Sequence, residues 1–294
     1  MDPLQFLTTT RLVVVAGKGG VGKTTVTAVL ARAAAARGLR VLVVELDGKP
    51  VLQSLLTAYE DGDGKHPAVE CITVTPTDAL GEYLDAHGLK RVSKRLTSSG
   101  IIDVVATAAP GIDDIVVLGK LKQLERSDLY DMVLVDGPAA GHAITMLLSA
   151  GAMLAAVRGG PIRTQAAEVA EMLADPARCQ VVLVTLPETT PVNEAIETAY
   201  ALEERIGVRL GPIVVNAVDL ADPLPADAAP AGSALRAAAE FRNARRALHR
   251  AEVARLSDDL ALPQVHIPFV PEADLDAAAV ASLAAGLVGG HGAP

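Results

Sequence analysis

A glycine-rich loop between a valine run and an alanine-rich segment constrains this chain more than any other feature of its sequence. The spacing is Gly17-x-x-x-x-Gly22-Lys23-Thr24, and the alanine-rich segment that follows, from residue 23 to about 37, is typical of a helix. Glycines let backbone N–H groups turn inward around phosphate oxygens, and the positive end of the following helix points at the same place. The pattern therefore predicts a phosphate-binding loop between a strand and a helix.

Side chains at the end of this loop are suited to a nucleoside triphosphate bound with Mg²⁺. We expect Lys23 to reach the β and γ phosphates and the Thr24 hydroxyl to bind Mg²⁺. The residues expected to surround the nucleotide are Gly17, Lys18, Gly19, Gly20, Val21, Gly22, Lys23, Thr24 and Thr25.

Lys18 is a second lysine that a phosphate-binding loop does not need. It follows the first glycine of the loop, where we expect its side chain to point away from the nucleotide of its own chain. A cation placed there can stabilise phosphate charge across a symmetric dimer interface, as an arginine finger does in other phosphoryl-transfer enzymes. The alternative is a solvated surface lysine.

Short β-branched runs alternate along the chain with longer segments rich in alanine and leucine. The runs lie at 11–17, 39–47, 69–74, 132–138, 180–188, 211–218 and 263–271. Because continuous apolar strands between helices indicate a buried parallel sheet, we predict an α/β fold with a doubly wound, mostly parallel sheet of about seven strands. Half of the residues are hydrophobic but only 2% are aromatic, so the core must consist of alanine, valine and leucine.

We expect a single domain over residues 1–294, with helices added to the sheet. About 80 residues separate the second strand from the run that begins at Met132, far more than an ordinary loop needs. They predict a helical insertion at about 77–124, and a second helical block is expected at about 141–174. An apolar run at 143–157 is shorter than the roughly 20 residues of a membrane-spanning helix, so we interpret it as a buried helix. The segment 219–233, rich in proline and alanine, is expected to be an exposed loop or linker.

The charge of the chain makes nucleic acid an unfavourable partner. With 26 basic and 35 acidic residues, the formal net charge is −9, which repels nucleic acid and anionic lipid at long range. One basic cluster, at 241–250, contains four arginines. It is expected to be an exposed helix face, with contact to a partner or a phosphate as the alternative.

The cysteines predict neither a disulfide framework nor a metal site. Cys71 and Cys179 are the two cysteines of the chain, and no CxxC pattern is present. This usage is typical of a protein in a reducing cytoplasm, which is the localisation we expect.

A second group of candidate residues follows the run at 132–138. Asp136 lies where a carboxylate can hold the water shell of Mg²⁺. The residues after it are expected to form a loop that responds to the γ-phosphate and pulls the next helix with it. The candidate residues of this switch are Gly137, Pro138, Gly141 and His142.

Two of these segments resemble a known class of ATPases. GKGGVGKTT at 17–25 is similar to the deviant Walker loop of the SIMIBI class of P-loop NTPases, and VDGPAAGH resembles the DTAPTGH switch of its ArsA and tail-anchored-protein targeting branch. The second match rests on Asp136, Gly141 and His142. The resemblance implies bound ATP and Mg²⁺, and a dimer in which Lys18 acts on the nucleotide of the other subunit.

The resemblance also implies a role for Asp47. In VVELDGKP at 43–50, this carboxylate is placed like the switch aspartate that orients or deprotonates the attacking water in that branch. The branch typically continues with Pro-Ala-His, whereas Gly-Lys-Pro follows here. Glu45, two residues earlier on the same side of the strand, is a competing base.

Adenine recognition is implied at two further positions. Asn216 stands where the branch has an asparagine that reads adenine, and an amide offers both a donor and an acceptor to the edge of the base. IPFVPEAD at 267–274 is similar to the loop that covers the base, with Phe269, Val270 and Pro271 as the expected contacts.

These observations together predict a Mg-ATP-hydrolysing dimeric switch of the ArsA and tail-anchored-targeting type. The CxxC through which eukaryotic targeting factors share zinc is absent, so we expect a dimer without structural zinc, either a homodimer or a heterodimer. The helical insertion would bind a client, and apolar residues at 146–154 could line a groove for a hydrophobic protein segment. The alternatives are a nucleotide-sensing regulatory module with little turnover and, less favoured by the charge, a partitioning ATPase that acts on DNA.

Overall fold

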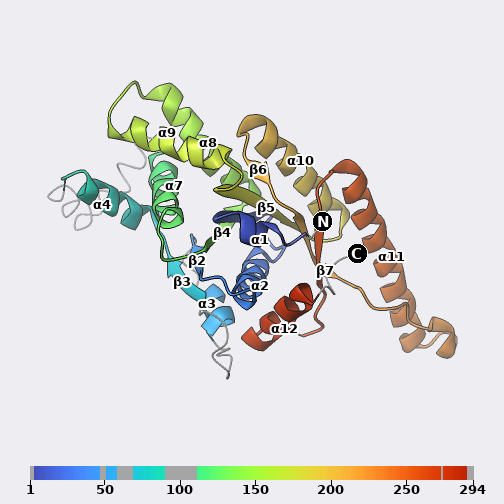
Figure 1. Cartoon of the computed structure of the whole chain (residues 1–294). Helices are drawn as coiled ribbons and strands as arrows, with labels where there is room; N and C mark the ends of the chain where they lie inside the picture. Colours follow the sequence, from blue (N-terminus) through green and yellow to red (C-terminus); the bar gives the residue numbers. More distant parts are fainter. Residues whose placement is uncertain (1–2, 47–50, 58–68, 90–110, 273, 290–294) are drawn as a thin grey trace.

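The computed structural model describes residues 3–46, 51–57, 69–89, 111–272 and 274–289 as a sheet covered by helices on both faces (Figure 1). The strands are β1 (Leu12–Gly17), β2 (Val41–Glu45), β3 (Val69–Thr73), β4 (Met132–Ala139), β5 (Cys179–Thr185), β6 (Arg209–Leu210), β7 (Ile213–Val218) and β8 (Gln264–Pro268). Their order is β3-β2-β4-β1-β5-β7-β8, with β6 beside β5. Every pairing within the described ranges is parallel, which confirms the predicted α/β fold.

The valine-rich sequence of β1 follows from its place in the middle of the sheet. All six residues of the strand are buried. Leu12 and Val14 contribute to the core on one face, and Val13 and Val15 contribute to the core on the other. A strand covered on both faces has no solvent side, so its sequence is a continuous apolar run rather than an alternating one.

One face of the sheet is covered by four helices of the described chain. They are α1 (Phe6–Thr9), α2 (Lys23–Ala36), α3 (Val51–Thr57) and α12 (Ala277–Val288). Helices α2 and α12 pack against each other. Alanine is the main buried residue of α2, and its small side chain lets the helix lie close to the sheet.

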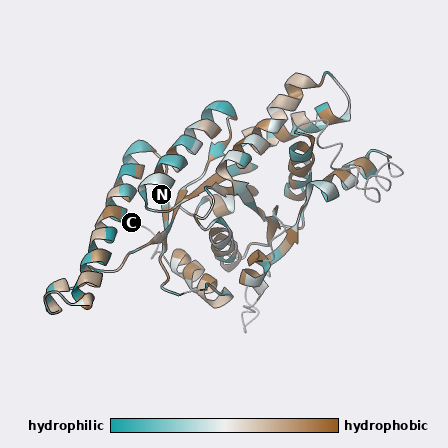
Figure 2. Ribbon diagram, turned by 180° about the vertical axis from the view of Figure 1, so that it is seen from behind, coloured by the Kyte–Doolittle hydropathy of each residue, from teal (hydrophilic) through white to brown (hydrophobic). Residues whose placement is uncertain are grey.

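The other face has the larger hydrophobic core. It is covered by α4 (Pro76–Ala86), α7 (Ile112–Glu125), α8 (Ala140–Ala156), α9 (Pro161–Ala174), α10 (Thr189–Arg205) and α11 (Ala234–Asp259). Figure 1 shows α4 and α11 at opposite ends of the molecule. Figure 2 shows the contrast between apolar strands inside and the hydrophilic residues along α11.

Three sequence predictions can be compared with these elements. The helices expected at 141–174 are α8 and α9. Of the insertion expected at 77–124, the structure describes α4 and α7, and residues 90–110 lie outside the described ranges. The eighth strand, β6, was missed because two residues cannot show a periodic pattern.

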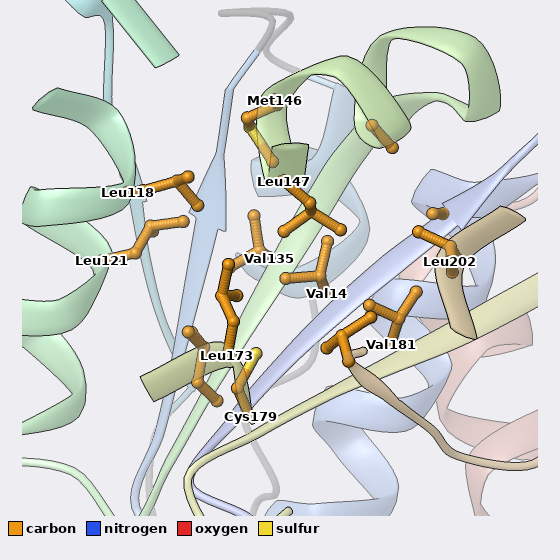
Figure 3. Packing of buried hydrophobic residues seen from close by; sticks show 14 of the residues in the cluster. Val14, Leu118, Leu121, Val135, Met146, Leu147, Leu173, Cys179, Val181 and Leu202 are labelled. Atoms are coloured by element: carbon orange, nitrogen blue, oxygen red, sulfur yellow. The ribbon is translucent and has the colours of Figure 1, made fainter. Parts of the chain in front are cut away.

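Helix α8 packs into the larger core, as the apolar run at 143–157 predicted. Met146 and Leu147 are only 2% and 1% exposed, and Figure 3 shows both directed at Val14 and Val135 of the sheet. The hypothesis that these two residues line an exposed groove is therefore wrong, because the sheet already covers them. No helix in the described part of the chain is both long enough and apolar enough to cross a membrane.

We expect Leu147→Ala to lower the free energy of unfolding by about 2–5 kcal/mol, because it removes a fully buried side chain and leaves a cavity. The matched control is Leu148→Ala, one residue along α8, where the side chain is only partly buried. Urea unfolding followed by circular dichroism measures both. Equal losses in the two variants would contradict the packing seen in Figure 3.

Candidate active site

A close contact and a left-handed backbone conformation explain the two outer glycines of the loop between β1 and α2. A Cβ atom at Gly17 would overlap the carbonyl oxygen of Val184 on β5. Gly22 is the N-cap residue of α2 and has φ +87°. This left-handed conformation is unfavourable for residues other than glycine. The loop therefore depends on glycine at both positions, as is typical of phosphate-binding loops.

Asn216 at the end of β7 holds this loop in place. Its Nδ2 donates a hydrogen bond of 3.0 Å to the carbonyl oxygen of Val21, and a Cβ atom at Gly22 would overlap the same Nδ2. The amide thus has a structural role that the sequence did not reveal. Its contact with adenine stays a prediction.

The two lysines of the loop point to different partners. Lys23 Nζ donates to the backbone carbonyl of Lys18 at 3.1 Å. Lys18 Nζ lies 2.5 Å from Glu194 Oε1 on α10, and its side chain is 42% exposed. Lys18 therefore reaches the surface, where it is paired with a carboxylate, and its action on a second subunit stays a prediction.

Thr24 and Asp136 meet across the gap between α2 and β4. Thr24 Oγ1 donates to Asp136 Oδ2 at 2.8 Å, and Thr27 Oγ1 lies 3.4 Å from Oδ1 of the same carboxylate. Hydroxyl and carboxylate oxygens are the ligands that Mg²⁺ prefers, directly or through water. The residues present are therefore suited to this ion.

Glu45 lies beside Asp136 at the carboxyl edge of the sheet. The two residues are in register on neighbouring strands, and Glu45 is 5% exposed, with Thr73 Oγ1 at 3.5 Å from its Oε2. Asp47 and the three residues after it lie outside the described residues. The choice between Asp47 and Glu45 as the base stays a prediction.

The switch segment differs in shape from the loop that we expected. Gly137 and Pro138 belong to β4, and α8 begins at Ala140 with no loop between them. Gly137 is required by close packing, because a Cβ atom there would overlap the carbonyl oxygen of Val15. Gly141 and His142 lie exposed in the first turn of α8. The residues expected to form the switch thus lie at the end of a strand and in the first turn of a helix.

Asp114 on the neighbouring helix α7 lies near His142. Burial raises the pKa of Asp114, and the nearby His142 acts in the opposite direction. The starts of α7 and α8 therefore lie close together.

A cavity of about 580 Å³ lies where β7 and β8 end, against α11. Phe269 and Pro271 line it, whereas Val270 packs against the hydrophobic core, and the contact of these residues with a base stays a prediction. The sequence analysis missed the wall formed by α11, which contributes Phe241, Arg242, Arg245, Arg246 and His249. The signal was present in the cluster of four arginines at 241–250, which we interpreted as an exposed helix face.

The two cysteines lie far apart in the sheet, and neither has the features of a reactive thiolate. Cys71 is on β3 and Cys179 on β5, with three strands between them. Burial raises the pKa of Cys179 to about 12 and that of Cys71 to about 11, so both are thiols near neutral pH. Within the described ranges, no group of three or more His, Cys, Asp or Glu side chains is arranged to hold a metal ion.

A loop of this geometry at the end of a central parallel strand is the hallmark of P-loop proteins that bind nucleoside triphosphates. Comparison with known proteins narrows this class. The model of the family described as anion-transporting ATPase matches residues 10–158, and the chain belongs to this family. It is accordingly an ATPase of the ArsA type.

Individual relatives agree with this assignment over most of the chain. The sequence is 30% identical to ATPase BagA of Mycobacterium tuberculosis, over 89% of this chain and 88% of that protein. It is 31% identical to the arsenical pump-driving ATPases of Acidiphilium multivorum and Escherichia coli, over 72% of this chain. These alignments cover 35% of each pump-driving ATPase, so this chain corresponds to about a third of those proteins.

Proposed function

We propose that this ATPase works as a Mg²⁺-dependent dimeric switch, with Lys18 of each subunit acting on the ATP of the other. The observation that carries the proposal is that the two lysines of the loop have different partners. Lys23 folds back onto the loop, whereas Lys18 extends to the surface. A surface cation at a phosphate loop has its clearest use when a second subunit presents a phosphate to it.

The residues of one chain supply most of the site. Lys23 would leave the Lys18 carbonyl and bind the β and γ phosphates, joined by the backbone N–H groups at the start of α2. Thr24 and Asp136 would hold Mg²⁺, which supplies positive charge to the phosphate oxygens when it is bound. Lys18 of the second subunit would then offset the charge that develops on the γ-phosphate.

Hydrolysis needs a carboxylate that orients a water molecule. The water oxygen forms a bond to the γ-phosphorus while the bond to the β–γ bridging oxygen breaks, and the carboxylate accepts the proton before phosphate takes it. Asp47 is the candidate that the family resemblance favours. Glu45 is the candidate supported by its position beside Asp136.

The nucleoside would occupy the edge of the sheet where β7 and β8 end. Phe269 and Pro271 offer apolar surface to a base in the cavity at α11. Asn216 lies between this cavity and the phosphate loop, because it is on β7 and contacts Val21. The arrangement supports a bound ATP that extends from the phosphate loop, at its phosphates, toward α11, at its base.

The output of the switch would be a change in the helices that follow β4. Helix α8 begins directly after this strand and packs against α7, α9 and α10. A second cavity, of about 510 Å³, lies among the ends of α8 and α9 and is lined mainly by small and apolar residues, including Ile112 and Met153. A hydrophobic protein segment is the client whose chemistry suits it.

A nucleotide-sensing module with little turnover is a second candidate. The ion pair between Lys18 and Glu194 favours it, because a lysine held within its own chain does not serve a neighbour.

The test is the mass of the purified chain in solution with and without MgATP, combined with turnover at increasing protein concentration. We expect nucleotide-dependent dimers, and turnover per chain that rises with protein concentration. In Asp136→Asn we expect turnover to fall about 10²-fold or more, because the water shell of Mg²⁺ loses its charged hydrogen-bond acceptor. A monomer whose turnover per chain is constant would contradict the dimeric switch, and one that only binds MgATP would support the sensing module.

A further inference from the structure

The ion pair between Lys18 and Glu194 joins the tip of the phosphate loop to the middle of α10. The separation of Nζ and Oε1 is 2.5 Å, and the Glu194 side chain is 38% exposed. The other carboxylate oxygen, Oε2, is buried and has no hydrogen-bond partner. Among the described residues, Lys18 is thus the sole hydrogen-bond partner of this carboxylate.

Glu194 belongs to a helix that is firmly attached on its far side. Arg255 of α11 donates to Asn193 Oδ1 at 2.8 Å and to Glu252 Oε2 at 2.7 Å. Thr189 Oγ1 donates to Glu252 Oε1 at 2.9 Å. These bonds tie the first turns of α10 to α11, whereas Lys18 lies in a loop, so we expect Lys18 to be the partner that moves when the ion pair opens.

We propose that Glu194 is a positioning residue that holds Lys18 within its own chain and so restrains the ATPase until a second subunit presents its nucleotide. The inference rests on the proposed function, in which Lys18 acts between subunits. The carboxylate of Glu194 and the phosphates of the second subunit compete for the same ammonium group. The ion pair must therefore open before the dimer can become active.

The strength of the ion pair between Lys18 and Glu194 depends on how exposed the two side chains are. Both side chains are more than a third exposed, so water and salt screen the pair. The multiply charged phosphates of MgATP attract the ammonium group more strongly than one carboxylate does. Removing the restraint should therefore shift the association of the subunits by about two- to fivefold rather than by orders of magnitude.

Helix α10 also packs against α8, the helix that follows the Asp136 strand. A nucleotide that changes the start of α8 thereby has a route to the helix that carries Glu194. The contact between α8 and α10 therefore connects nucleotide binding in a subunit to the ion pair of Lys18 in that same subunit.

The experiment compares Glu194→Gln with wild type in turnover at increasing protein concentration. The matched control is Glu197→Gln, which makes the same change one turn further along α10 at an exposed position. We expect Glu194→Gln to reach half of its maximal turnover per chain at a two- to fivefold lower protein concentration. The maximal turnover and the affinity of the monomer for MgATP, measured with a fluorescent ATP analogue, should stay at the wild-type level. Glu197→Gln should match wild type throughout.

The double variant Lys18→Ala/Glu194→Gln decides whether the effect passes through Lys18. The dimerisation midpoint of this variant in MgATP should equal that of Lys18→Ala alone. A shift that persists without Lys18, a lower maximal turnover in Glu194→Gln, or no shift at all would overturn the restraint. If Lys18→Ala keeps wild-type turnover, the proposed function itself fails, whatever Glu194→Gln does.

Discussion

Lys18→Ala should lower ATP turnover about 10²- to 10³-fold while it leaves the affinity for MgATP within a few-fold of wild type. In the proposed dimer the ammonium group is absent from the nucleotide of its own chain and touches only the phosphates of the partner. Losing it therefore removes stabilisation of the transition state but little of the binding energy. Single-turnover hydrolysis and equilibrium binding of a fluorescent ATP analogue separate the two quantities.

Subunit mixing shows whether the lysine acts between chains. A subunit with Lys23→Ala cannot hold its own nucleotide well but still carries Lys18, and a Lys18→Ala subunit has the opposite defect. Random pairing of equal amounts gives one mixed dimer in two, each with one complete site, so about a quarter of the wild-type activity should return. Two inactive variants that stay inactive when mixed would contradict action between subunits.

Gly22→Ala should weaken ATP binding more than about tenfold by disturbing the loop itself. The residue has φ +87°, and its new Cβ atom would overlap the Nδ2 of Asn216. Either the loop or the amide must move, and both positions are needed for the hydrogen bond to Val21. Isothermal titration with MgATP measures the loss, which we expect to exceed about tenfold from the backbone strain of 1–2 kcal/mol and the overlap together.

Gly38→Ala is the control that separates these two causes. Gly38 has nearly the same backbone angle, φ +86°, but a Cβ atom there meets nothing within 4 Å. The control should lose about 1–2 kcal/mol of stability and retain ATP binding. Partial recovery of binding in Gly22→Ala/Asn216→Ala would identify the overlap as the main cause. Equal binding losses in the two single glycine variants would show that the contact with Asn216 is unimportant.

The sequence predicted those parts of the molecule that depend on local pattern. The valine run of β1 and the alanine-rich α2 were recognisable because burial on both faces and close helix packing each leave a compositional mark. The phosphate loop was recognisable because its backbone demands glycine at fixed positions. The family match at residues 10–158 covers these same elements.

The parts that the sequence did not predict depend on contacts between distant residues. Gly137 was expected in a switch loop, but it belongs to β4, and a Cβ atom there would overlap the Val15 carbonyl oxygen. Asn216 resembled a base-reading amide, and its observed partner lies 195 residues earlier in the chain. The arginines of α11 resembled a solvated face because their cavity is completed by the ends of β7 and β8. A local sequence pattern contains no information about contacts between residues that are far apart in the chain.

The glycines at the ends of β1 and β4 have a mechanical consequence. At Gly17 and at Gly137, a carbonyl of the neighbouring strand occupies the volume where a side chain would be, so the three central strands are locked together beside the phosphate loop. A sheet joined so closely deforms little and transmits force as a rigid plate. In the proposed switch, the movement that follows hydrolysis would begin where this rigid sheet ends, at the junction of Ala139 and Ala140, and α8 would carry it over its whole length.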